Sequence, residues 1–184
     1  MKSILKMYQK VEKALKTANS RQNDHFFANR QKHVALTGLL QATGEIELYA
    51  TRHAAFLEAC DAELKSRQAS NRAVDTLLKR KEEYALAVSP IKCNQVVNLP
   101  DGVKEWSRAL IVEVHYNDWD KDPLKAFYFN AMPIADDDTL VERHLEFDDI
   151  EPERLMEANR EIVNAFYESP VGQEVMELHR TLIH

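Results

Sequence analysis

The sequence predicts an α+β fold dominated by helices, with an N-terminal helical bundle or hairpin, a small antiparallel sheet in the middle and C-terminal helices. Three observations lead to this prediction. Apolar residues recur at helical spacing through the first half of the 184 residues. Alternating apolar segments bounded by turn residues follow them. Only 4 residues are glycine, which disfavours a sandwich rich in glycine turns and excludes the glycine loops that bind phosphates.

The first predicted helix covers residues 2–18. Its apolar positions are Ile4, Tyr8, Val11, Leu15 and Ala18. A polar break is expected over residues 19–24, where Asn23 or Asp24 would cap a second helix that runs to about residue 43. Gly44 would end that helix, because glycine accepts the left-handed backbone conformation that often follows a helix.

The third helical stretch has the clearest apolar pattern. One face carries Ile46, Tyr49, His53, Leu57, Cys60 and Leu64. We expect one long helix, because no Gly or Pro lies between residues 45 and 89. Pro90 ends this helical half. A second apolar set lies ahead of the third helical stretch and is made of Phe26, Phe27, Leu36, Leu39 and Leu40. A small sheet cannot cover both sets, so we expect the N-terminal helices to meet a partner helix, with self-association as the result.

Strands are expected in the middle of the chain. They cover residues 93–99, which a Pro-Asp-Gly turn closes, then 108–116 and 126–132, with Pro133 as the stop. Residues 139–147 fit either a strand or a short helix with a capping box, and we predict the helix. Two more helices follow. Pro152 stands near the start of the first, and Ser169 caps the second ahead of Pro170.

Charge divides the chain into two parts. Residues 1–81 carry a net charge of +7, and residues 82–184 carry −13. We therefore predict a basic helical region over residues 1–85 and an acidic α+β region over 86–184, together forming one folded unit. A charged partner, or the opposite half of another copy, would fit such an asymmetry. The candidate partner-binding residues are Lys2, Lys6, Lys10, Lys13, Lys16, Asp136, Asp137 and Asp138.

Two histidines are candidates for chemistry. His115 would share a sheet face with Glu113 and could act as a general base. His144 would share a face with Glu142 and Glu146 if that segment were a strand, and imidazole with carboxylates can bind a metal. The acidic loop over residues 117–123 lacks the glycine and the distal glutamate of a calcium loop, so we expect a hairpin turn there. The sequence predicts no cofactor and assigns no catalytic or metal-binding residue.

The sequence favours a binding protein over an enzyme. The leading hypothesis is a non-enzymatic cytoplasmic binding or adaptor protein that acts through charged surfaces as an oligomer. The cytoplasmic location is expected because no apolar stretch is long enough for a signal peptide or a membrane span, and because Cys60 and Cys93 fit two reduced thiols. One alternative is a nucleic-acid-associated protein that uses the basic helices. The other is an enzyme or metal protein with a site near His115 or His144.

Overall fold

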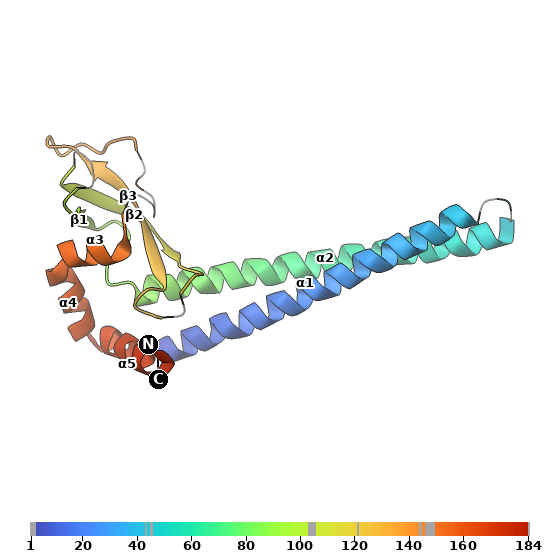
Figure 1. The fold of residues 1–184 in the computed structure, drawn as a ribbon, viewed down its shortest axis with the longest axis horizontal. Helices are drawn as coiled ribbons and strands as arrows, with labels where there is room; N and C mark the ends of the chain where they lie inside the picture. Colours follow the sequence, from blue (N-terminus) through green and yellow to red (C-terminus); the bar gives the residue numbers. More distant parts are fainter. Residues whose placement is uncertain are drawn as a thin grey trace. The chain divides into compact units, whose positions relative to one another are not determined.

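A computed structural model describes residues 3–42, 44, 46–102, 106–120, 122–143, 145 and 150–183. Within these ranges the elements are α1 (Ile4–Gln41), α2 (Ile46–Val88), β1 (Val96–Asn98), β2 (Arg108–Tyr116), β3 (Phe127–Ile134), α3 (Pro152–Ala158), α4 (Arg160–Glu168) and α5 (Pro170–Ile183). Two long helices, a small antiparallel sheet and C-terminal helices follow one another along the chain (Figure 1), which confirms the predicted fold class. The chain divides into two compact units, Val11–Lys79 and Met1–Lys10 with Arg80–His184.

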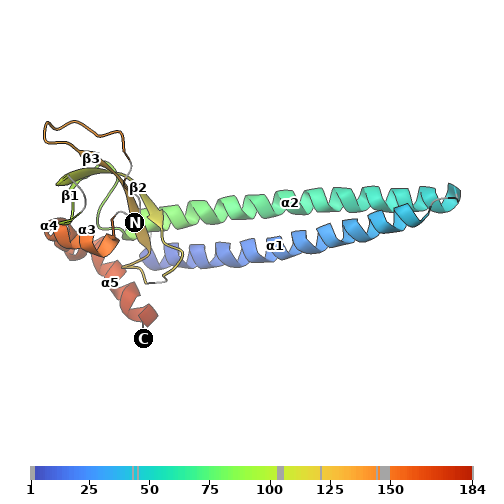
Figure 2. The same ribbon diagram turned by 45° about the horizontal axis from the view of Figure 1, so that its top comes forward.

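The unit Val11–Lys79 is a hairpin of two antiparallel helices, the long blue and green helices of Figure 2. The two helices meet along a seam whose residues recur every seven positions. On α1 the seam residues are Val11, Ala18, His25, Lys32 and Leu39, and on α2 they are Phe56, Glu63, Ser70 and Leu77. A seven-residue repeat is the pattern of a left-handed coiled coil, because 3.5 residues per turn keep the seam on the partner helix.

The predicted break at residues 19–24 is wrong, because α1 continues through it. No glycine or proline lies in this segment, and Asn, Ser and Asp each cost only about 0.5 kcal/mol in an exposed helix. Arg21 and Asp24 also form an ion pair across one helical turn, at 3.3 Å. The seam residues on either side of this segment, Ala18 and His25, are seven positions apart. An unbroken helix therefore keeps both side chains facing α2.

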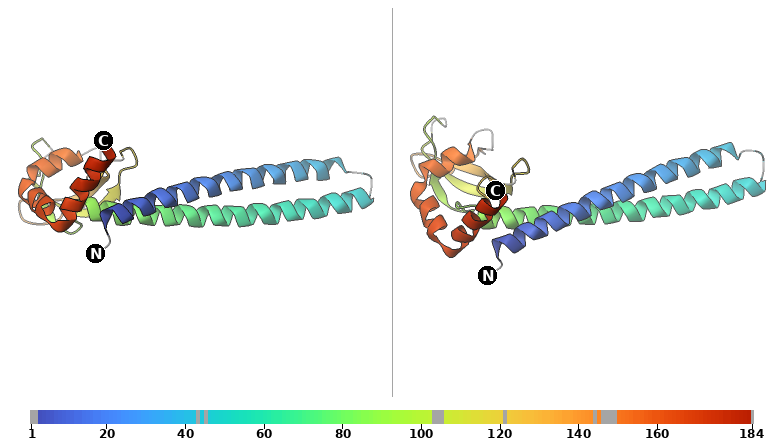
Figure 3. Two further views of the ribbon diagram at one scale, coloured as in Figure 1. Left: turned by 90° about the horizontal axis from the view of Figure 1, so that it is seen from below. Right: turned by 60° about the horizontal axis from the view of Figure 1, so that its bottom comes forward.

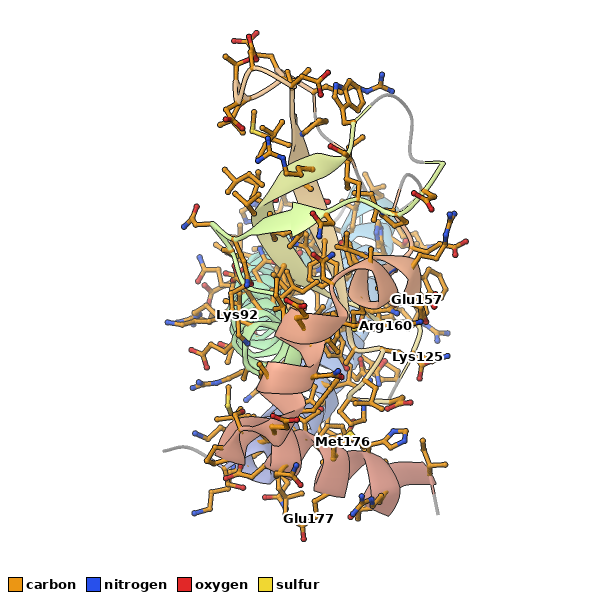
Figure 4. The ribbon with its side chains drawn as sticks, turned by 90° about the vertical axis from the view of Figure 1, so that its left-hand side faces the viewer. Lys92, Lys125, Glu157, Arg160, Met176 and Glu177 are labelled. Carbon is orange, nitrogen blue, oxygen red and sulfur yellow. The ribbon has the colours of Figure 1, made fainter. Side chains whose placement is uncertain are left out.

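The prediction of one long third helix is confirmed by α2. Gly44, in the connection between α1 and α2, has a φ of 119°, a backbone conformation that residues other than glycine rarely adopt. At the other end, α2 stops at Val88, ahead of Pro90 as expected. The Lys92 ammonium, labelled in Figure 4, donates hydrogen bonds to the carbonyls of Leu86, at 2.8 Å, and Ser89. These bonds satisfy carbonyls that the end of the helix leaves without an intrahelical partner.

The sheet has the strand order β1-β2-β3 with both pairs antiparallel. The strand predicted at residues 108–116 is confirmed as β2, whereas β1 is shorter than the predicted 93–99. The two halves of β2 bury opposite faces of the strand. Ala109 and Ile111 are buried in the first half, but Val114 is buried in the second. A bulge between Ile111 and Glu113 inserts an extra residue and moves the buried side from odd to even positions.

Two predictions about the end of the sheet are wrong. Pro133 does not stop β3, which continues to Ile134 with Pro133 paired to Ala109. The carbonyl of Pro133 still accepts a hydrogen bond from the Val141 amide at 2.9 Å. Proline therefore costs the strand only the one hydrogen bond that a backbone N–H would have donated. The described residues of the predicted 139–147 helix are not helical, and Leu140 and Leu145 instead form isolated bridges to β3. Leu145 exchanges two backbone hydrogen bonds with Ala131 and is fully buried. Burial of that apolar side chain outweighs the local capping signal.

The predicted helix that begins near Pro152 is divided at Asn159 into α3 and α4. The next helix starts as predicted, with the Ser169 hydroxyl accepting a hydrogen bond from the Gly172 amide at 3.1 Å. Figure 3 shows α3, α4 and α5 following one another beside the sheet. Leu155 of α3 and Val175 of α5 are fully buried, as are Phe127 and Phe129 of β3, so the core of this unit draws on both strands and helices.

Candidate interaction surface of the helical hairpin

The helical hairpin exposes an unusual number of large apolar side chains. On α1 they are Phe26, Phe27, Val34 and Leu40, and on α2 they are Ile46, Leu48, Tyr49, Leu57, Leu64 and Leu78. Single exposed apolar residues are ordinary, but a contiguous set on one element marks an interaction surface. Because the sequence places these residues at helical spacing, they form continuous faces rather than scattered points.

One such face runs along α2 and carries most of the stripe that the sequence predicted. Ile46 is 89% exposed, Leu57 54%, Leu64 41% and Leu78 56%. Cys60 is half-buried, and His53 is exposed and stacked against Tyr49 with ring centroids 6.0 Å apart. The residues of this face recur along α2 at alternating steps of four and three, and we call the whole set the α2 face. Its members are Ile46, Ala50, His53, Leu57, Cys60, Leu64, Arg67, Asn71, Val74 and Leu78.

The α2 face is distinct from the seam that α2 shares with α1. Leu57 and Leu64 each follow a seam residue, Phe56 and Glu63, so the face is turned by about 100° from the seam. A different open groove on the hairpin is lined by Phe27, Val34 and Ala35 of α1 with Arg52 and Ala55 of α2. None of these five residues belongs to the α2 face.

A polar layer lies inside the seam. The carboxylate of Glu63, whose side chain is 10% exposed, is 3.2 Å from the Lys32 ammonium and 3.8 Å from Nδ1 of His25. The hydrogen bond from Lys32 lowers the pKa of Glu63 below its ordinary value of 4.5. Sliding one helix by a turn would leave a carboxylate in the seam without its cation, so this layer specifies the register of the hairpin.

The structure places the predicted lysines on the exposed surface of α1. Lys6, Lys10, Lys13 and Lys16 are all exposed, and none forms an ion pair with any residue that the structure describes. Lys2, the fifth member, lies outside the described residues. The use of these lysines for binding stays a prediction.

The predicted acidic residues Asp136, Asp137 and Asp138 form the exposed turn after β3. Two of them have partners in the chain. Asp138 pairs with Arg108 at 2.5 Å, and Asp137 accepts hydrogen bonds from the amide and hydroxyl of Thr139. These bonds from Thr139 lower the pKa of Asp137. The turn is therefore held in part by its own carboxylates, and a role in partner binding stays a prediction.

His115 belongs to a cross-strand polar cluster. Its Nε2 lies 2.9 Å from Oε2 of Glu113 and 3.0 Å from Nδ2 of Asn130, which itself donates to Glu113 at 3.1 Å. Register explains the cluster, because Glu113 pairs with Asn130 and His115 with Tyr128, whose ring stacks on the imidazole. Nε2 is thus engaged within the sheet. His144, the other candidate, and Glu146 lie outside the described residues, and an enzyme or metal site at either histidine stays a prediction.

Sequence reasoning missed a second polar group, which joins the loop after β2 to α5. Nδ1 of His179 lies 2.6 Å from Oδ1 of Asp122, which also accepts the Leu124 amide. The acidic loop is a turn as predicted, with Asn117 and Asp120 accepting the amides of Trp119 and Asp122. Of its carboxylates, Asp120 and Asp122 accept backbone amides, and Asp118 pairs with the Lys81 ammonium. No sequence signal could have paired residues 57 positions apart.

Within the described part of the chain, no group of three or more His, Cys, Asp or Glu side chains converges as a metal site. Among the same residues, no helix has an apolar stretch that could cross a membrane.

The chain matches no protein-family model, no curated protein and no solved structure at a significant level.

Proposed function

We propose that this protein is a non-enzymatic binding protein that works as an oligomer and uses its helical hairpin as the assembling surface. The observation that carries the proposal is the α2 face, where four large aliphatic side chains between Ile46 and Leu78 are each at least 41% exposed. Burying one such side chain contributes about 1.5–3 kcal/mol. The hairpin therefore gains free energy from any partner that covers this face.

Coiled-coil geometry supports the same proposal. A hairpin of two helices has one seam, and each helix of this hairpin buries only a narrow line of residues in it. Both helices are apolar over a wider arc than one seam can use, which is typical of helices that pack on two neighbours. The exposed lysines and aspartates would then steer encounters between partners, while the apolar contacts provide the affinity.

Co-purification of two differently marked copies tests the proposal. We expect an untagged copy of the chain to co-purify with a tagged copy expressed in the same cells. The variant Leu64→Glu/Leu78→Glu should lose this co-purification, because burying two carboxylates in an apolar interface costs several kcal/mol.

A matched control places the same charges elsewhere on α2. Ala62→Glu/Thr76→Glu alters two exposed positions that lie on the other side of the helix from the α2 face. This control should co-purify as the parent does, and circular dichroism should show the same helix content in all three proteins. Retained co-purification of the Leu64→Glu/Leu78→Glu variant would contradict the proposal.

A further inference from the structure

The α2 face is organised as a second heptad repeat. From Ile46 to Leu78 its members alternate steps of four and three residues. This spacing is the one that lets a helix pack along its whole length against another helix. Further along the same face, Ala85 and Val88 are fully buried. The uncovered part of the repeat therefore ends near Leu78, and it spans about 50 Å of helix.

We propose that the α2 face pairs with the α2 face of a second copy in antiparallel orientation, with the symmetry axis at Ala62. This inference rests on the proposed function and specifies its partner and its geometry. Two independent properties of the described residues support it, namely the match of side chains across the axis and the distribution of charge along α2.

Antiparallel alignment about Ala62 pairs apolar with apolar or polar with polar side chains in four of the five layers of the face. Three of its five layers are apolar, one is polar, and one sets a leucine against the aliphatic part of an arginine, whose charged end can reach solvent. The layers pair Ile46 with Leu78, Ala50 with Val74, Cys60 with Leu64, His53 with Asn71, and Leu57 with Arg67 of the second copy. Parallel alignment would instead place Arg67 against Arg67, which brings like charges together.

Charge along α2 favours the same orientation. Residues 46–61 hold three acidic side chains and one basic, a net charge of −2, whereas residues 63–78 hold three basic and two acidic, a net of +1. Antiparallel pairing about Ala62 places each half against the oppositely charged half of the second copy. Parallel pairing would set each half against its own charge.

Distances between spin labels on the two copies test the orientation. The labels are introduced one at a time by Ala54→Cys, Asp61→Cys or Asp75→Cys in the complete chain with Cys60→Ala, which keeps that layer apolar, and Cys93→Ser. All three sites lie beside the α2 face. In an antiparallel pair the two labels are offset along the helix by about 3 Å for each residue between the site and Ala62. Dipolar electron paramagnetic resonance should therefore give the shortest distance at 61, a longer one at 54 and the longest at 75.

The pattern of distances separates the outcomes. The expected offsets along the axis are about 24 Å at 54, about 3 Å at 61 and about 39 Å at 75, to which the spacing of the helices adds. Equal distances at all three sites would show a parallel pair and overturn the inference while leaving the proposed function standing. A dimer without the minimum at 61 would overturn it in the same way. If sedimentation shows that the parent chain is a monomer, both proposals fail.

Discussion

At the scale of single residues, Asn159 shows how one side chain can join distant parts of the chain. Its amide lies at the corner between α3 and α4. The Oδ1 atom accepts the Asn98 amide at 2.9 Å, while Nδ2 donates to the carbonyls of Asn98 and Leu155, each at 2.8 Å. The side chain thus extends the hydrogen bonding of β1 as a neighbouring strand would. Because Asn159 is only 5% exposed, water cannot replace these bonds.

We expect Asn159→Ala to destabilise the protein by about 2–4 kcal/mol, because it removes three hydrogen bonds and leaves buried backbone groups without partners. Asn164→Ala is the matched control. Asn164 is exposed within α4, so its replacement should change stability by no more than about 0.5 kcal/mol. Urea unfolding followed by circular dichroism measures both. Equal stability of the two variants would show that the Asn159 amide contributes nothing.

The sequence predicts hydrogen bonds between near neighbours in the chain, but not those between distant residues. Ser169 was predicted as a cap because its partner, the Gly172 amide, is three residues away. Asn98 ends β1, and Asn159 lies 61 residues further along the chain, between α3 and α4. Local patterns carry no information on such a pairing, since it is set by how the helices fold back onto β1.

At the scale of elements, long-range packing decides where local signals fail. Polar residues at 19–24 looked like a break, but the seven-residue repeat of the seam spans them. A capping signal at residue 139 indicated a helix, but bridges to β3 and the burial of Leu145 hold the segment in a non-helical conformation. The strand at 108–116 and the unbroken helix after residue 45 were predicted correctly, because alternation and the absence of Gly and Pro are local properties.

The corner between α4 and α5 requires glycine. A Cβ atom on Gly172 would lie 2.1 Å from the Phe166 carbonyl oxygen, a backbone atom that cannot move away without opening the corner. We expect Gly172→Ala to destabilise the protein by about 2 kcal/mol or more. Thermal unfolding monitored by calorimetry measures the effect.

Gly38→Ala is the control, and it should have the opposite sign. In the interior of α1, a Cβ at Gly38 would come within 3.2 Å only of the mobile end of Arg52. Alanine should therefore stabilise the helix by about 0.5–1 kcal/mol. A loss of stability in Gly38→Ala equal to that in Gly172→Ala would refute the argument from the corner.

The polar layer of the hairpin makes its stability depend on pH. Folding lowers the pKa of Glu63 below 4.5, chiefly through the hydrogen bond from Lys32. A carboxyl group with a lowered pKa stabilises the folded state at pH values above its unfolded pKa. That contribution is lost as the pH falls through the folded value. We therefore expect the hairpin to open more readily below about pH 4.5.

Hydrogen exchange of the α2 amides near Glu63 can measure this opening. At neutral pH, Glu63→Gln should reduce protection relative to the parent, because the ion pair with Lys32 is lost. As the pH falls below 4.5 the difference between the two proteins should shrink, since the parent then loses the same charge. A constant difference from pH 7 to pH 3 would show that the Glu63 carboxylate does not stabilise the seam.

At the scale of the whole molecule, the exposed lysines of α1 and the apolar α2 face would suit different kinds of partner. The exposed lysines of α1 are the feature that nucleic acid would use. If nucleic acid binds there, replacing all five of Lys2, Lys6, Lys10, Lys13 and Lys16 by glutamine should weaken binding at low salt. It should also lower the salt slope by about one unit for each phosphate contact removed. Fluorescence anisotropy with two unrelated duplexes measures both quantities.

Lys65→Gln/Lys79→Gln is the control for that experiment, because it removes exposed charge from α2 instead of α1. Binding should be indifferent to sequence, since lysines offer point charges and no bidentate contact to bases. Equal affinity of the fivefold variant and the parent would mean that the lysines of α1 are only a solvated surface. No binding by the parent at low salt would eliminate the nucleic-acid alternative.

The central claim is that the exposed face of the hairpin is an interface between copies of this chain. Sedimentation equilibrium of the 184-residue protein at roughly tens of micromolar tests it most directly. The claim predicts a species of about twice the chain mass of 21.2 kDa, and a shift toward the single-chain mass in Leu64→Glu/Leu78→Glu but not in Ala62→Glu/Thr76→Glu. A parent protein that sediments as a 21.2 kDa monomer at every concentration would contradict it.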